Sequence, residues 1–188
     1  MLGYSGEKAI ERSSRSMNKI IFTVSIIITG FFGSIVLAQK PVASFQDWGV
    51  YTSKDPKLCW LSSTASKVEN TRNGKPAVNV TRGDIFLFIT YLPSKNILGE
   101  VSFAGGYPFK VEQMVKLQIG SAKYDLIPEG NYAWPANQKI DTKIRVSMTR
   151  GSTAVVRAES IKGTKTKDTF SLRGFTAALK ATKSRCGI

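Results

Sequence analysis

Residues 115–126 read V-K-L-Q-I-G-S-A-K-Y-D-L, two alternating runs joined by Gly120-Ser121. Less polar side chains occupy every second position on both sides of that pair: Val115, Leu117, Ile119, Ala122, Tyr124 and Leu126. Because successive side chains of a strand point to opposite faces, this pattern predicts two half-buried strands. A Gly-Ser pair suits the two-residue loop of a β-hairpin. The stretch therefore predicts an antiparallel sheet with one apolar face.

Three further stretches carry strand signals. Residues 143–149, K-I-R-V-S-M-T, alternate strictly, which predicts a strand with its Ile, Val and Met side chains on the buried face. A turn at 150–152 then leads into a second predicted strand at 154–160. Residues 84–92, D-I-F-L-F-I-T-Y-L, are nearly all apolar, as expected of a strand that is covered on both faces.

Only the C-terminus departs from this β pattern. Positions spaced i, i+3, i+4 and i+7 after Gly174 hold Phe175, Ala178, Leu179 and Thr182. This spacing predicts a short helix, which must pack on the sheet to persist. Short strands separated by Gly, Pro and Asn turns are typical of β-sandwiches and barrels. The sequence thus predicts an all-β fold, an antiparallel β-sandwich or barrel-like domain with a short C-terminal helix.

The N-terminus has the layout of a secretory signal. Lys19 precedes a run at 20–36 in which every residue is apolar or small. Val36-Leu37-Ala38 then offers small or compact residues at the positions that a signal peptidase reads, and Gln39 follows. A basic flank, an apolar stretch and such a site together predict a cleaved leader.

The leader leaves two points open. Residues 1–16 make it long, so that Met17 is an alternative start. An uncleaved membrane anchor is the competing interpretation, although the apolar run is shorter than the roughly 20 residues that a spanning helix needs. We expect a signal peptide at 1–38 and one domain at 39–188, exported to the periplasm, the outer membrane or the cell surface.

The composition is strongly basic. The chain has 27 Lys and Arg against 13 Asp and Glu, a formal net charge of +14. The leader holds four of these cations and two of these acids, so the exported part keeps +12. A charge of this size favours association with anionic surfaces, and it also serves as a coat that keeps a protein soluble. Composition leaves both interpretations open.

Two groups of basic residues are candidates for binding. The predicted terminal helix carries Lys180, Lys183 and Arg185. A predicted loop carries Lys162, Lys165 and Lys167. A solvated charged face is one interpretation, and the sharper hypothesis makes this loop a docking site for anionic envelope or host-surface components. Interleaved base-stacking aromatics are missing there, and export argues against nucleic acid.

Little in the sequence supports catalysis. There is no histidine, which removes Ser-His-Asp and Cys-His catalysis and the commonest general base. Two distant cysteines cannot form a thiolate zinc site unaided, so we predict no metal, no cofactor and no catalytic residue. The alternative is a periplasmic hydrolase that uses two of the scattered carboxylates on a β-sandwich. Aromatic residues either fill the core or line a ligand groove, chiefly Trp48, Trp60, Trp134, Tyr107 and Tyr132.

Both cysteines, Cys59 and Cys186, lie in the part predicted to be exported. An oxidising compartment makes a disulfide the default for two thiols. The chain-entropy model gives such a long loop roughly 5 kcal/mol of stabilisation. Two free thiols, one of them reactive, are the alternative, but no C-x-x-C motif and no histidine lies near either residue to favour it.

Several short motifs extend over nearly the whole exported part. They are Phe45–Tyr51 (F-Q-D-W-G-V-Y), Lys57–Trp60 (K-L-C-W), Asn96–Val101, Gly106–Phe109 (G-Y-P-F), Ala133-Trp134, Gly163-Thr164, Asp168–Ala178 and Cys186. In order and spacing they resemble the invasion-associated locus B (IalB) proteins of alphaproteobacteria. Where that family often has Gly-Asp-Trp, this chain has Gln46-Asp47-Trp48, a difference that would change a turn.

The resemblance implies an exported, non-enzymatic protein of the periplasm or outer membrane. Such a protein would contribute, through binding, to host-cell invasion or to envelope function. No catalytic motif belongs to the family, so the resemblance implies no catalytic residue. Cys59 and Cys186 match its usual cysteine pair.

Overall fold

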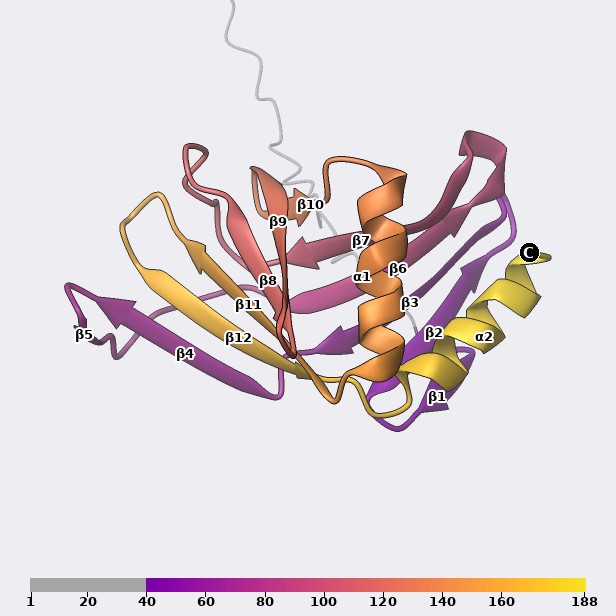
Figure 1. Cartoon of the computed structure of the whole chain (residues 1–188), viewed down its shortest axis with the longest axis horizontal. Helices are drawn as coiled ribbons and strands as arrows, with labels where there is room; N and C mark the ends of the chain where they lie inside the picture. The colour runs from indigo at the N-terminus through magenta and orange to yellow at the C-terminus, as the bar shows by residue number, and fades with distance from the viewer. Residues whose placement is uncertain (1–39) are drawn as a thin grey trace, which may run out of the picture. The chain divides into compact units, whose positions relative to one another are not determined.

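The computed structural model describes residues 40–188 (Figure 1). The predicted leader, its cleavage site and the alternative start at Met17 lie outside these residues. The helices are η1 (Pro93–Lys95), α1 (Gln138–Arg150) and α2 (Phe175–Cys186). The strands are β1 (Ala43–Phe45), β2 (Trp48–Ser53), β3 (Leu58–Thr64), β4 (Lys67–Arg72), β5 (Lys75–Pro76), β6 (Phe86–Leu92), β7 (Ile97–Ala104), β8 (Val115–Ile119), β9 (Ala122–Glu129), β10 (Tyr132–Trp134), β11 (Thr153–Glu159) and β12 (Lys165–Ser171).

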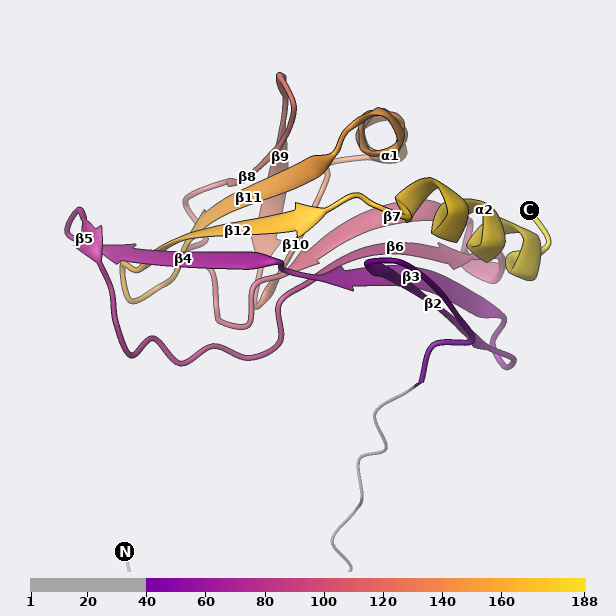
Figure 2. The same cartoon turned by 90° about the horizontal axis from the view of Figure 1, so that it is seen from below.

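Neighbouring strands pair antiparallel throughout, in the order β1-β2-β3-β6-β7-β10-β9-β8-β11-β12-β4-β5. The sheet curls because β3 leads directly into β4, which pairs near the other edge. At the bend between them, the Ser66 N–H donates to the Thr169 carbonyl on β12 over 2.7 Å. Figures 1 and 2 show β3 and β4 forming one bent ribbon, with both helices on the same side of β2, β3 and β6. The predicted antiparallel, sandwich-like fold with a C-terminal helix is confirmed.

The hairpin predicted at 115–126 is present as β8 and β9. Ile119 pairs with Ala122, and Gly120 in the turn has a φ of +56°, a value that glycine adopts without strain. The strand predicted at 84–92 begins at Phe86. The prediction that both of its faces are covered is wrong. Within residues 40–188, only alternate side chains of β6 are fully buried, and the others are half-buried.

Helix α2 closes one end of the core. Trp48 is buried, donates from Nε1 to the Ser171 carbonyl over 3.0 Å and meets Phe175 edge-on. Gly174, with a φ of +85°, precedes the helix, and a Cβ there would collide with the Phe45 carbonyl. Glycine therefore permits the close approach of α2 to β1.

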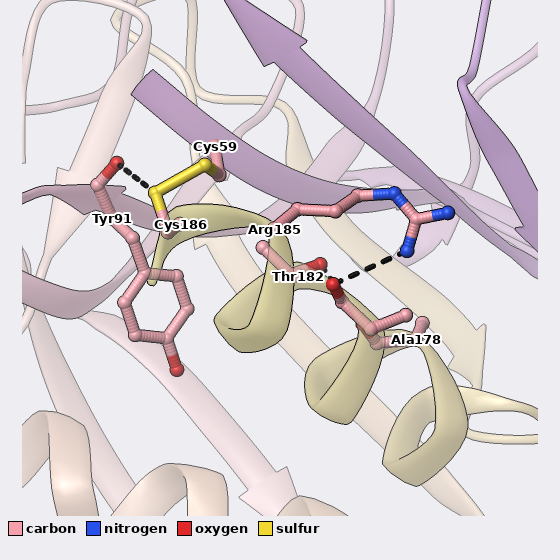
Figure 3. The surroundings of a disulfide bond; sticks show 7 residues. Cys59, Tyr91, Ala178, Thr182, Arg185 and Cys186 are labelled. Atoms are coloured by element: carbon pink, nitrogen blue, oxygen red, sulfur yellow. Dashed lines mark hydrogen bonds between the residues drawn. A yellow bond between two sulfur atoms is a disulfide. The ribbon is translucent and has the colours of Figure 1, made fainter. Parts of the chain in front are cut away.

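A disulfide joins α2 to the sheet. It links Cys59 on β3 to Cys186, the last residue of α2 (Figure 3). Both cysteines are buried, and the Cys186 sulfur lies 3.7 Å from the Tyr91 carbonyl oxygen. The disulfide predicted from the two cysteines is present.

The strand predicted at 143–149 is wrong, since these residues belong to α1. Asn137 caps the helix by accepting from the Ile140 N–H over 3.1 Å. Ile144 and Met148, four residues apart, are buried, whereas Val146 is 44% exposed. Alternation at 144, 146 and 148 had suggested one buried strand face, but only the two positions with helical spacing pack inward.

Two side chains of α1 attach the helix to an irregularity in β7. The pairing of β6 with β7 skips Gly99, which has a φ of +96°. Asp141 accepts from the Val101 N–H over 2.8 Å, and Arg145 donates to the Gly99 carbonyl. Burial raises the pKa of Asp141, and the bond from Val101 opposes that rise. None of the helices in residues 40–188 is long and apolar enough to span a membrane.

Candidate anion-binding pocket

A buried ion pair joins the segment at 77–85 to β12. Arg82 donates from Nη1 and Nη2 to the two carboxylate oxygens of Asp168 over 2.8 and 2.7 Å. The side chains are 5% and 0% exposed. Burial raises the pKa of Asp168, and the two bonds from Arg82 oppose that rise. This bidentate geometry fixes the guanidinium plane.

The remaining guanidinium donors of Arg82 tie other segments to β12. Nε and Nη2 donate to the Gly105 carbonyl over 3.0 and 2.8 Å, and Nη1 reaches Asn70 Oδ1 on β4 at 3.3 Å. The segment at 77–85 is thus held against the end of β7 and against β4. Figure 2 shows this segment running from β5 back to β6 on the side where β11 turns into β12.

Tyr107 packs beside the ion pair. Its hydroxyl lies 2.6 Å from Thr166 Oγ1, and Arg82 lies over its ring at 4.9 Å from the centroid. Phe109 meets the ring edge-on at 5.1 Å. Burial raises the pKa of Tyr107 to about 12, so the phenol stays neutral and hydrogen-bonded at physiological pH.

These groups form the inner part of a hollow of about 530 Å³. Its walls come from the end of β4, the 77–85 segment, the bend at 106–108 and the β11–β12 turn. Arg72, Arg82 and Lys162 line it, and none of its described lining residues is Asp or Glu. Arg82 is neutralised by Asp168, but Arg72 and Lys162 form no ion pair within residues 40–188. We call this hollow the cationic pocket.

Arg72 is held in place by a neutral partner. Its Nη2 and Nε donate to Thr164 Oγ1, just before the neighbouring strand β12, with Nε at 3.2 Å. Thr164 is in turn fixed by its own N–H, which donates to Ser160 Oγ over 3.1 Å. A hydroxyl positions a guanidinium without cancelling its charge, so Arg72 remains available to an anion.

Strand alternation divides the three lysines that the sequence placed on one loop. Lys162 lies in the β11–β12 turn and lines the cationic pocket, but Lys165 and Lys167 belong to β12. Thr164 and Thr166 point to the pocket side of this strand, so Lys165 and Lys167 point to the other face. The prediction of a single loop cluster is therefore wrong in its placement.

Lys165 and Lys167 border an open depression on the outer face of β4, β12, β11 and β8. Glu69, Glu112 and Glu159 also line it, so its charge is mixed. Lys167 lies 2.9 Å from Glu69, and the hydrogen bonds from Lys167 and Lys67 hold the pKa of Glu69 below its usual value. This surface favours anions less than the cationic pocket does.

A smaller hollow of about 330 Å³ beside the disulfide also carries positive charge. Lys54, Lys57 and Arg185 line it, the last of these from α2. Arg185 donates to the Ala181 carbonyl. No buried polar network comparable to the Arg82–Asp168 pair supports it within residues 40–188, so it serves below as the alternative anion site.

The sequence model of the invasion associated locus B (IalB) protein family matches residues 48–183. The chain belongs to this family. Its fold is similar to that of invasion associated protein b from Bartonella henselae, solved by crystallography, with a TM-score of 0.50 and 14% identity. The similarity covers 76% of this chain and 95% of the Bartonella chain. No curated protein sequence matched the chain.

Three of the motifs that resemble the IalB family meet at the cationic pocket. Gly106–Phe109 contributes Tyr107, Gly163-Thr164 contributes the partner of Arg72, and Asp168 anchors Arg82. Arg72 and Arg82 lie outside every quoted motif, and nothing near them in the sequence marks them as pocket residues. Arg82 and Asp168 are 86 positions apart, so only the folded chain shows the pair.

The aromatic residues proposed for core or groove are divided between several environments. Trp48 lies in the core. Trp60 stacks on Tyr51, and Trp134 stacks on Tyr132, each pair partly exposed on the sheet. Of the five aromatics named from the sequence, Tyr107 is the one that lines the cationic pocket.

Asp141 is a carboxylate whose charge acts on a second carboxylate, Glu100. Burial raises the pKa of Glu100, and the charge of Asp141 raises it further. Asp141 is held by the Val101 N–H, and neither residue lines any hollow described above. We therefore assign Asp141 to the attachment of α1. Within residues 40–188, no group of three or more Cys, Asp or Glu is placed to hold a metal ion.

Proposed function

We propose that this IalB-family protein is exported to the cell envelope and binds anionic envelope or host-surface components rather than transforming a substrate. The observation that supports this proposal is the cationic pocket. Two cations that form no ion pair within residues 40–188 line it, and Thr164 already holds one of them, Arg72. Charge-assisted hydrogen bonds to phosphate or carboxylate are about twice as strong as neutral ones. A preorganised site also avoids the cost of ordering its side chains on binding.

The binding prediction separates the pocket from the net charge. Arg72→Gln/Lys162→Gln should weaken binding to lipopolysaccharide at least about 10-fold, because each hydrogen bond to a charged group contributes about 1.5–3 kcal/mol. The matched control is Lys165→Gln/Lys167→Gln, which removes the same charge from the other face of β12. The measurement is a binding isotherm for each variant at low and high salt.

Affinity of the unmodified protein should fall as salt rises, since the Debye length shrinks from about 10 Å at 0.1 M to about 3 Å at 1 M. Equal losses in the two double variants would assign binding to net charge and reject the pocket. An affinity that does not change with salt concentration would show that the binding is not electrostatic.

Export is the second part of the proposal. The intact mass of protein recovered from the envelope should correspond to a chain that begins at Gln39. A leader still attached would make the protein membrane-anchored instead. The name of the similar Bartonella protein adds host-cell invasion as a biological role to test. In an organism that enters cells, the Arg72→Gln/Lys162→Gln protein should then fail to restore entry to a deletion strain.

A further inference from the structure

The rim of the cationic pocket is apolar. Val78 is 81% exposed and Ile161 is 61% exposed, and both line this one hollow. Val78 is the most exposed large hydrophobic side chain among residues 40–188. Single exposed aliphatic residues are ordinary, but a group around a hollow marks a surface that is covered in use. Val80 and Pro108 extend the same lining.

The 77–85 segment and the β11–β12 turn each supply both apolar and cationic lining. Val78 and Val80 belong to the 77–85 segment, which Arg82 anchors, and Ile161 sits beside Lys162 in the β11–β12 turn. A volume of about 530 Å³ falls within the range of about 300–1,000 Å³ that is typical of small-molecule sites. A lone inorganic anion would leave the aliphatic lining in water.

Several polar and aromatic groups of the pocket are already engaged by contacts within the protein. Tyr107 is the aromatic residue of the lining, but Arg82 lies over its ring and Phe109 packs at its edge. Arg82 therefore occupies one of the two ring faces on which a sugar or base could stack. The hydroxyls of Thr164 and Thr166 are bonded to Arg72 and Tyr107. The exposed residues Asn79 and Thr81 also line the pocket, so its available surface combines positive charge, a few polar groups and exposed aliphatic side chains.

We propose that the cationic pocket binds a lipid-like amphiphile, with its anionic head group on Arg72 and Lys162 and its acyl chain against Val78 and Ile161. This inference rests on the proposed anion-binding function and adds the ligand class. The cations supply head-group charge complementarity, and burial of methylene groups against the rim supplies the remaining affinity. An envelope protein would meet such molecules in the membranes around it.

The experiment compares the binding of three probes by calorimetry: ethyl phosphate, dodecyl phosphate and dodecyl maltoside. The two dodecyl compounds are kept below their critical micelle concentrations. Each methylene fully removed from water contributes roughly fourfold to affinity. Dodecyl phosphate should therefore bind at least about 10-fold more tightly than ethyl phosphate. It should also bind at least about 10-fold more tightly than dodecyl maltoside, which lacks the charge.

Substitutions then assign the two halves of the ligand. Val78→Ser/Ile161→Ser should remove the advantage of dodecyl phosphate and leave ethyl phosphate binding unchanged. Arg72→Gln/Lys162→Gln should weaken the binding of both ethyl phosphate and dodecyl phosphate. The matched control is Val111→Ser, which changes a valine that is 69% exposed outside the pocket and should alter neither affinity.

Each contrary result has a distinct meaning. Equal binding of the two phosphates would overturn the amphiphile inference and leave anion binding intact. Equal binding of dodecyl phosphate and dodecyl maltoside would overturn the inference, because it would show non-specific adsorption of the alkyl chain. A loss of affinity in Val111→Ser equal to that in Val78→Ser/Ile161→Ser would have the same meaning. Binding of neither phosphate would reject the anion-binding function together with this inference.

Discussion

Replacing Arg82 with Met should lower the free energy of unfolding by about 3–5 kcal/mol at pH 7, the cost of leaving one member of a buried ion pair uncompensated. Asp168 is 0% exposed, so water cannot replace the lost guanidinium. The loss is measured by urea denaturation. The double variant Arg82→Met/Asp168→Leu should recover most of it, because no buried charge is left.

The Arg82→Met loss should also depend on pH. Burial raises the pKa of Asp168, and Arg82 opposes that rise, so removing Arg82 raises this pKa further. A folded-state pKa above the unfolded value gives stability that is present at low pH and lost as pH rises through it. The loss should therefore be smaller near pH 4 than at pH 7. A pH-independent loss, or no recovery in the double variant, would show that the ion pair is not its cause.

Removing the disulfide should have an effect of similar size. Cys59→Ala/Cys186→Ala should lower the free energy of unfolding by about 2–5 kcal/mol, since the bridge closes a loop with a sequence separation of 127. Amide hydrogen exchange in α2 should also become faster, because the bridge joins this helix to β3. Thermal unfolding should show a fall in Tm of roughly 5 °C or more.

A reductant serves as the control for this experiment. It should lower the Tm of the unmodified protein toward that of the double alanine variant and leave the variant unchanged. Ready alkylation of Cys59 and Cys186 in unreduced protein would contradict a structural disulfide. A variant as stable as the parent would show that the loop-entropy argument fails for this chain.

The sequence predicted those parts of the fold whose signal is local. The 115–126 hairpin has an alternating pattern and a turn pair, and α2 has helical spacing next to Gly174, so short-range rules suffice. The 143–149 prediction failed because alternation and four-residue spacing coincide at Ile144 and Met148. Asn137 and Gly151 at the ends of α1 were the signals that favour a helix there.

The candidate site was only partly predictable, for a different reason. Lys162 was identified from its charge, and it does line the cationic pocket. Arg72 acquires its role from Thr164, 92 positions away, and Arg82 acquires its role from Asp168. Long-range pairing of strands creates these neighbours, and no local pattern of the sequence encodes them.

The central claim is that anions bind in the cationic pocket rather than over the basic surface at large. The most direct test is a set of amide correlation spectra of isotope-labelled, unmodified protein titrated with ethyl phosphate. We predict shift changes concentrated at Arg72, Tyr107, Lys162 and Thr164. Changes centred on Lys54, Lys57 and Arg185, or spread over the exposed lysines, would contradict the claim.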